Sequence, residues 1–284
     1  MRAVSGLSYH PSTYTMLADA RAAMIRIEKV EGLVEGIIFG PVLSRRFGRS
    51  LGINPLPATR KICTFDCPYC ECGRTARAES LRLSSQPFPN ADQVVSAASE
   101  AICAAACEGT NIDTLTFTGN GETTLHPQFE AIVDGVVALR ERLLPCAETV
   151  VLTNGTRLSE PSVRRALERI DQCVIKVDAG TESTFRRINR PLESSTLEAI
   201  TAAAAQMSRV IVQTMFVRGI VDNTLPSEIE AWIERLARIR PRSVQIYSLE
   251  RKPAEVGLIA VEAAELKQLA ELASQRTNLP IDVY

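Results

Sequence analysis

Cys63-Thr64-Phe65-Asp66-Cys67-Pro68-Tyr69-Cys70 is the stretch that decides how this chain is interpreted, and it holds three of the 8 cysteines. The cysteines are spaced Cys-x3-Cys-x2-Cys, and Glu71-Cys72-Gly73 follows at once. The proline and the glycine indicate a loop, in which three thiolates can converge on one centre without unwinding regular structure. We therefore interpret the stretch as a set of metal ligands.

Cys63, Cys67 and Cys70 are the predicted ligands. Soft sulfur ligands select zinc or iron–sulfur centres, and a [4Fe–4S] cluster ordinarily takes four ligands, so three thiolates suit a cluster with one open iron. The alternative is a zinc-stabilised binding protein without catalytic activity, in which Cys72 closes a tetrahedron. A disulfide is a third interpretation, and it has little support because the chain shows no secretory signal.

The cysteine spacing, with Tyr69 directly before the last cysteine, resembles the radical S-adenosylmethionine superfamily. The resemblance implies a [4Fe–4S] cluster whose open iron is chelated by the amino and carboxylate groups of S-adenosylmethionine. It also implies reductive cleavage of that cofactor to a 5'-deoxyadenosyl radical, which abstracts hydrogen from a substrate. An electron donor such as flavodoxin or ferredoxin is then an expected partner.

The composition is that of a folded protein without strong charge. The chain has 284 residues, of which 45% are hydrophobic, and a net charge of −1. This is enough for a large core, and it argues against a broadly basic surface for nucleic acid. We expect no membrane span because no run of eighteen apolar residues occurs, and we expect a cytoplasmic location by default.

Short apolar strands alternate with helices along most of the chain, which predicts a parallel sheet with crossover helices. Strands are predicted near 36–39, 50–54, 115–118, 149–153, 173–177, 210–217 and 243–247, and helices near 91–107, 127–143, 161–169, 194–206, 226–238 and 261–275. Counting the strand before the cysteines gives six βα units, the number in the open (β/α)6 partial TIM barrel of the resembled superfamily. A doubly wound sheet is the alternative. We expect one α/β domain at 36–284 and an N-terminal extension at 1–35 with a helix near 16–30.

Ligands collect at the carboxyl ends of parallel strands, so residues that follow the strands are candidates for binding. The turn Gly119-Asn120-Gly121-Glu122 after the strand at 115–118 looks like the superfamily's Gly-Gly-Glu motif, which binds the methionine amino group. Asn120 departs from that motif, and asparagine tolerates left-handed geometry. A plain turn with a solvated acid is the alternative.

Three further strand ends carry candidates for the cofactor site. Asn154 follows the strand at 149–153, where Asn-Gly would also serve as a turn. Lys176 and Asp178 share one face of an apolar strand, either as a structural ion pair or as contacts to the carboxylate and ribose of S-adenosylmethionine. Gln213 and Met215 would line the adenine side, although a methionine is as easily a core residue.

Several stretches narrow the resemblance to a small group related to the radical enzymes that build the tricyclic wyosine base in tRNA. They are residues 40–46, 50–52, 178–180 and 185–191, and the similarity spans about 36–255. Those enzymes carry extra N-terminal cysteines for a second cluster that handles pyruvate, whereas no cysteine precedes Cys63 here. Wyosine chemistry itself is therefore in doubt.

Three substrate classes remain: a small anionic metabolite, a tRNA base, and a protein backbone as in glycyl-radical activases. The neutral overall charge favours a small molecule. Arginines near the predicted rim favour an anion; they are Arg45, Arg46, Arg49, Arg186, Arg187 and Arg190. Cys72 is expected to be a small packing residue under the loop, and a fourth ligand or a hydrogen-atom donor beside the radical are the alternatives. The remaining cysteines are expected in the core; they are Cys103, Cys107, Cys146 and Cys173.

Overall fold

The computed structural model describes residues 32–75, 88–251 and 253–284. Within them eight strands form one sheet in the order β1-β2-β3-β4-β5-β6-β8-β10. Their bounds are β1 Ile38–Ser44, β2 Gly48–Ile53, β3 Thr114–Phe117, β4 Glu148–Thr153, β5 Gln172–Lys176, β6 Val210–Met215, β8 Ser243–Tyr247 and β10 Ile281–Val283. β1 is antiparallel to β2, and every other neighbouring pair is parallel.

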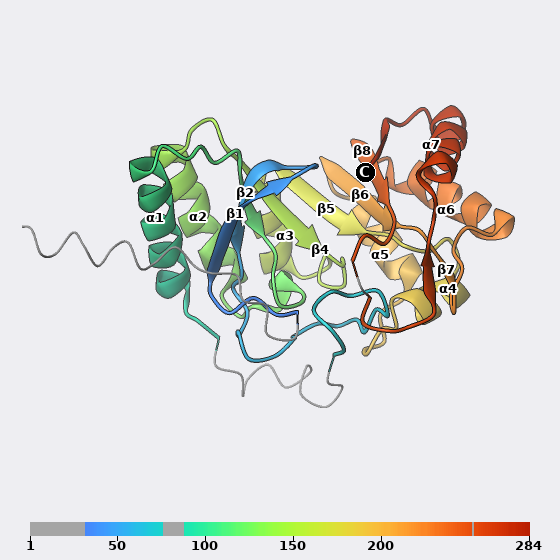
Figure 1. The fold of residues 1–284 in the computed structure, drawn as a ribbon, viewed down its shortest axis with the longest axis horizontal. Coiled ribbons are helices and arrows are strands. Elements are labelled where there is room, and N and C mark those ends of the chain that lie inside the picture. The colour runs from blue at the N-terminus through green and yellow to red at the C-terminus, as the bar shows by residue number, and fades with distance from the viewer. Residues whose placement is uncertain (1–31, 76–87, 252) are drawn as a thin grey trace, which may run out of the picture.

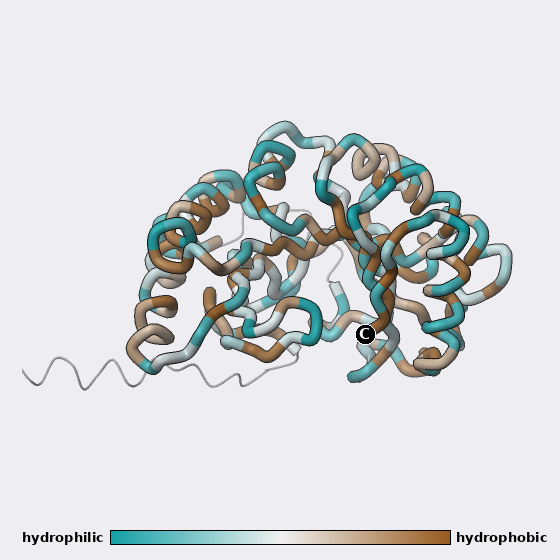
Figure 2. The backbone as a smooth tube through the Cα atoms, turned by 90° about the horizontal axis from the view of Figure 1, so that it is seen from above, coloured by the Kyte–Doolittle hydropathy of each residue, from teal (hydrophilic) through white to brown (hydrophobic). Residues whose placement is uncertain are grey.

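The helices cover one side of this sheet, which curls into an open half-barrel (Figures 1 and 2). They are α1 Ala91–Cys107, α2 Phe129–Leu143, α3 Pro161–Glu168, α4 Glu182–Ile188, α5 Leu197–Ala204, α6 Pro226–Ile239 and α7 Ala263–Thr277, with a short 3-10 helix η3 at Thr123–Leu125. Most consecutive helices contact each other, as α1 does with α2 and α6 with α7. This single layer confirms the predicted (β/α)6 half-barrel, and the doubly wound alternative is wrong.

The structure differs from the predicted elements in three places. The strand predicted at 210–217 is broken, because β6 ends at Met215 and a separate strand, β7 Val217–Gly219, pairs with β9 Leu258–Ala260. The C-terminal tail is a strand, β10, that extends the sheet beyond β8. Helix α4 was not anticipated; it begins after Thr181, whose hydroxyl accepts a hydrogen bond from the Thr184 amide at 3.3 Å.

The N-terminal helix predicted near 16–30 lies outside the described residues, and the division at residue 35 stays a prediction. Within the described residues, no helix has the length and apolar character needed to cross a membrane.

Helix α1 shows why the cysteines differ in burial. Its buried residues are Val94, Ala98, Ile102 and Ala105, a stripe with helical spacing that faces the sheet. Cys103 and Cys107 lie off this stripe and are exposed, as is Cys146, so the prediction that these three are core residues is wrong. Cys173, on β5, is buried as expected.

The inner face of the half-barrel changes from apolar to polar toward the carboxyl ends of the strands. Phe47, between β1 and β2, packs against Val150, Val174 and Ile211, which lie on β4, β5 and β6. Closer to the carboxyl ends the register places polar side chains in one row: Lys176 pairs with Gln213, and Gln213 with Gln245. The hairpin β1–β2 therefore covers an apolar floor, and the polar part of the inner face lies at the end where half-barrels bind ligands.

The outer face is held to α6 by a buried hydrogen bond. The indole of Trp232, which is 1% exposed, donates to the Thr214 hydroxyl at 3.0 Å. The same hydroxyl donates to the Val177 carbonyl at 2.7 Å. Thr214 therefore joins α6 to the end of β5, where two of the candidate site residues lie.

Thr214→Val is expected to lower the free energy of unfolding by about 1–3 kcal/mol, because it leaves a buried indole N–H without an acceptor. Urea unfolding followed by the fluorescence of Trp232, the sole tryptophan, measures the loss. In a Trp232→Phe background the same substitution should cost less, as measured by circular dichroism. Equal costs in the two backgrounds would contradict this role of Thr214.

Candidate active site

Residues 61–73, which we call the cysteine loop, lie at the carboxyl ends of the parallel strands. Two isolated bridges tie the loop to the barrel: Ile62 pairs with Gly121 after β3, and Phe65 pairs with Pro191 after α4. The backbone on either side of the first cysteine is therefore fixed by two separate elements.

Three of the four cysteines of the loop are the predicted ligands. Cys63 and Cys70 are half-buried, and Cys67 is buried. The Cys72 thiol lies 3.4 Å from the carbonyl oxygen of Gly119, to which it donates, and it is also close enough to hydrogen-bond to the Cys70 sulfur. The described residues contain no group of three or more histidine, cysteine, aspartate or glutamate side chains set to hold one metal ion. Neither the three-cysteine ligand set nor a zinc tetrahedron is therefore preformed in the described residues.

The three ligand cysteines differ in the pKa of their thiols because their surroundings differ. Burial raises the pKa of Cys63 to about 12 and that of Cys67 to about 11. The pKa of Cys70 is lowered to about 5, chiefly because Cys72 hydrogen-bonds to its sulfur and also because Lys61 lies near. Burial opposes the charge on Lys61, but the three ligand sulfurs outweigh it and raise its pKa. Three thiols beside one buried ammonium suit a thiolate-bound iron–sulfur cluster, whose assembly displaces the thiol protons.

The turn after β3 holds the start of the cysteine loop. The Ile62 amide donates to the Asn120 carbonyl at 2.9 Å, and the Glu122 amide donates to the Ile62 carbonyl at 2.8 Å. Gly121 has φ +132°, and a Cβ atom there would lie 1.9 Å from the Ile62 carbonyl oxygen. The Asn120 side chain is fully buried and bonds both the amide and the carbonyl of Val34 at 2.7 Å. This turn is therefore a clamp on the loop.

Glu122 is buried, and hydrogen bonds occupy its carboxylate. It accepts from the Thr124 amide at 3.1 Å, the Thr153 hydroxyl at 2.8 Å and the Asn154 amide at 2.6 Å. Burial raises the pKa of Glu122 in spite of these donors. Asn154 in turn reaches the cysteine loop, with its side-chain nitrogen 3.6 Å from the Cys63 sulfur. Glu122 therefore fixes the end of β4 against the first ligand.

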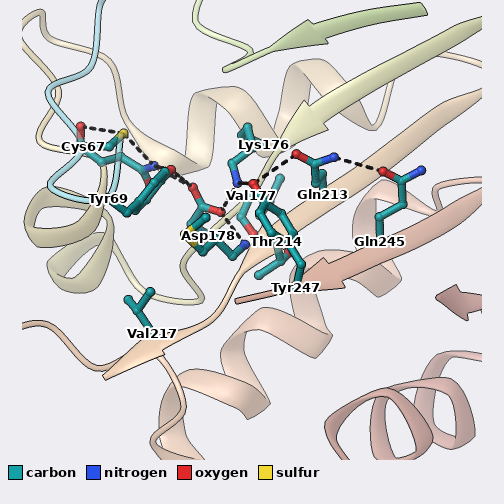
Figure 3. Close-up of polar contacts among 12 residues, drawn as sticks. Cys67, Tyr69, Lys176, Val177, Asp178, Gln213, Thr214, Val217, Gln245 and Tyr247 are labelled. Carbon is teal, nitrogen blue, oxygen red and sulfur yellow. Dashed lines mark hydrogen bonds and ion pairs between the residues drawn. The ribbon is translucent and has the colours of Figure 1, made fainter. Parts of the chain in front are cut away.

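Lys176 and Asp178 form the ion pair that the sequence allowed, with 2.9 Å between their charged atoms. The Asp178 side chain is 0% exposed and also accepts from the Tyr69 hydroxyl and the Met215 amide. Lys176 also donates to the Tyr247 hydroxyl at 2.8 Å. Figure 3 shows the chain of contacts, which runs from the cysteine loop through Asp178 and Lys176 across the inner face.

Asn189 is a site residue that the sequence interpretation missed. Its side-chain nitrogen donates to Asp178 at 2.9 Å and to the Tyr69 hydroxyl at 3.2 Å, and it lies 3.6 Å from the Cys67 sulfur. Asn189 directly follows α4, the helix that was not anticipated. The stretch at 185–191 that carried the family resemblance was the one signal that pointed to it.

Five of the six arginines proposed to bind an anion already have protein partners. Arg45 contacts Glu250, Arg49 contacts Asp113, Arg186 contacts Glu182, Arg190 contacts Glu255, and Arg187 donates to the Ile220 carbonyl. Four of the five have a carboxylate partner, and Arg187 has a carbonyl partner. The sixth, Arg46, differs from them because its side chain has no hydrogen-bond or ion-pair partner within the described residues.

Gly121→Ala is expected to lower the free energy of unfolding by about 2 kcal/mol or more and to reduce iron uptake, because the Cβ atom would push Ile62 and the cysteine loop away. Gly109→Ala is the matched control: Gly109 has φ +68°, and a Cβ atom there meets nothing within 4 Å. Chemical unfolding and iron analysis after anaerobic reconstitution measure both variants. If the two variants lost stability and iron equally, the clamp would be refuted.

Comparison with known proteins places the chain in a family. Residues 59–231 match the family described as "Radical SAM superfamily". The "UPF0026 protein" of Synechocystis sp. is 33% identical over 211 residues, which are 74% of this chain and 74% of that protein. The "UPF0026 protein" of Helicobacter pylori strain J99 is 28% identical over 219 residues, which are 76% of this chain and 67% of that protein.

The fold is also found among solved structures. The "Structure of TYW1 with a lysine-pyruvate adduct bound" superimposes with a TM-score of 0.57 at 16% identity, covering 80% of this chain and 73% of the other. At that identity the likeness concerns the fold alone. With three cysteines held over the carboxyl ends of an open half-barrel and a family match over residues 59–231, the chain belongs to the radical S-adenosylmethionine superfamily of enzymes.

Proposed function

We propose that this protein cleaves S-adenosylmethionine reductively and uses the resulting radical on a small anionic substrate. The observation that carries the proposal is the cysteine loop. It presents three thiols and one buried ammonium, and it is clamped to the ends of β3 and α4. When bound, a [4Fe–4S] cluster would supply the electron that yields a 5'-deoxyadenosyl radical able to abstract hydrogen.

Each candidate residue has a role that follows from its contacts. Cys63, Cys67 and Cys70 would hold the cluster, and Lys61 offsets part of the thiolate charge. Cys72 is not assigned as a ligand, because Cys63, Cys67 and Cys70 alone match the cysteine spacing of the superfamily. Three ligands leave one iron for the amino and carboxylate groups of S-adenosylmethionine.

The remaining candidates would shape the cofactor site around that iron. They are Tyr69, Gly119, Asn120, Gly121, Glu122, Asn154, Lys176, Asp178 and Met215. Glu122 and Asp178 act here as positioning residues, since their carboxylates are already occupied by protein donors. Lys176 remains a charged donor on the inner face, because nearby Asp178 and Tyr247 raise its pKa against the effect of burial.

The expected partners follow from the chemistry. A reductive cleavage needs a one-electron donor, and a flavodoxin or ferredoxin in the cytoplasm would serve. We favour a small molecule as substrate because the chain has no net basic character, with a charge of −1. The alternative is a tRNA base, which is suggested by the resemblance of residues 40–46, 50–52, 178–180 and 185–191 to the wyosine-building enzymes. A protein backbone is a further alternative, for which the described residues give no specific support.

Replacing Cys63, Cys67 and Cys70 together by alanine is expected to reduce bound iron from about four per chain to almost none, because the thiolates are the ligands. Cys72→Ala is the control and should keep the iron and the cleavage of S-adenosylmethionine. Absorbance, iron analysis and 5'-deoxyadenosine formation after anaerobic reconstitution measure this. Full iron content in the triple variant, or one zinc per chain in the native protein, would reject the proposal.

Glu122→Gln is expected to weaken binding of S-adenosylmethionine by tenfold or more, since the new amide group must face donors that now point at the carboxylate. Titration calorimetry on reconstituted protein measures the affinity, and iron analysis shows that the cluster is present. Glu130→Gln serves as the control, because Glu130 is on the surface and pairs with Arg165. If Glu122→Gln bound S-adenosylmethionine with unchanged affinity, Glu122 would have no role in the cofactor site.

A further inference from the structure

Arg46 differs from the other arginines near the half-barrel. It lies between β1 and β2, in the turn that covers the inner face, and its backbone amide donates to the Ser44 hydroxyl at 3.2 Å. The Nη1 atom of its guanidinium is buried, and within the described residues it has no hydrogen-bond partner. Neighbouring Arg45, by contrast, is paired with Glu250. A buried donor without an acceptor is uncommon and costly, so it calls for a ligand.

Aromatic rings surround this guanidinium without satisfying it. Its central carbon lies 4.7 Å from the ring centroid of Tyr247 and 6.0 Å from those of Phe47 and Tyr284. The face of an aromatic ring attracts a cation, but the N–H groups in the guanidinium plane still need acceptors. The rings therefore hold Arg46 in position and leave its buried Nη1 donor without a hydrogen-bond partner within the described residues.

A second cation lies against the same ring. The Lys176 ammonium is 4.8 Å from the Tyr247 centroid, and its charge is balanced by Asp178. Among the described residues no carboxylate forms an ion pair with Arg46, whereas Lys176 is paired with Asp178. A half-buried charge is stable when a counter-ion joins it, and a guanidinium binds carboxylate or phosphate through two parallel hydrogen bonds.

We propose that Arg46 is the anchor for an oxyanion, a carboxylate or a phosphate, of the substrate, and that Tyr247 holds the guanidinium in place. The proposal rests on the proposed function, because it assigns a substrate class to the same site. Tyr247 is joined through Lys176 and Asp178 to Tyr69 in the cysteine loop (Figure 3). A substrate held by Arg46 would therefore extend along the inner face toward the three sulfurs.

The test uses two simple probes on the full reconstituted chain: inorganic phosphate and succinate, each titrated at constant ionic strength set by sodium chloride. Thermal unfolding reports binding, because a ligand of the native state raises the melting temperature in a saturable way. Native protein should be stabilised by at least one probe. Stabilisation by phosphate alone would identify a phosphate site, by succinate alone a carboxylate site, and by both an anchor for either group.

Arg46→Gln is expected to weaken probe binding by about tenfold to a hundredfold, the range for a lost charged hydrogen bond. Arg46→Lys keeps the positive charge but not the two parallel N–H donors of the guanidinium, so it should weaken probe binding less than Arg46→Gln does. Arg45→Gln is the matched control, since Arg45 is the adjacent residue, is exposed and pairs with Glu250; it should bind as the native protein does. If Arg46→Gln misfolds, the probe affinity of native protein is compared with that of Arg46→Lys instead.

Two results would overturn the inference: no saturable stabilisation of native protein by either probe, or equal stabilisation of native protein and the Arg46 variants. Iron content and 5'-deoxyadenosine formation are measured on the same native preparation. Normal iron and cleavage without anion binding would reject the Arg46 site alone. If the chain took up no iron but still bound the anion saturably through Arg46, the radical chemistry would be rejected and the Arg46 anion site would be supported.

Discussion

The cysteine loop keeps its place because its backbone is paired with the turn after β3. Ile62 exchanges main-chain hydrogen bonds with Asn120 and Glu122, as a strand would with its neighbour. This pairing requires the close approach that only a residue without a side chain permits at Gly121. A loop that must present three sulfurs to one centre cannot rely on its own contacts. The barrel therefore provides the rigidity that the loop lacks.

Support for the ligands continues through a second layer of buried polar residues. Glu122 holds Asn154 against the first cysteine, and Asp178 holds Tyr69 beside the third. Asn189 reaches both Asp178 and the middle cysteine, Cys67. Glu122, after β3, accepts from Thr153 on β4, and Asp178, after β5, accepts from the Met215 amide at the end of β6. The ends of β3 to β6 are therefore tied together under the loop. Such networks specify one arrangement when they are fully satisfied.

Much of this could be predicted from the sequence, because the spacing of cysteines and the period of apolar strands are local properties. Parallel strands bring their carboxyl ends together, so Glu122, Asn154, Lys176 and Asp178 were expected to share one edge of the sheet, and they do. What could not be predicted depends on long-range contacts. Asn189 acquires its role from the unanticipated α4, and the half-exposed face of α1 determines that its cysteines are not core residues.

The same limit applies to the arginines, which look alike in the sequence. Whether an arginine can bind a ligand depends on whether the fold places a carboxylate beside it. Arg45, for example, pairs with Glu250, which is 205 residues away in the sequence. The balance of charge on the inner face is therefore a property of the fold. The ligand sulfurs face Lys61, and Asp178 faces Lys176. Within the described residues no carboxylate forms an ion pair with Arg46, and the proposed anion site rests on this difference.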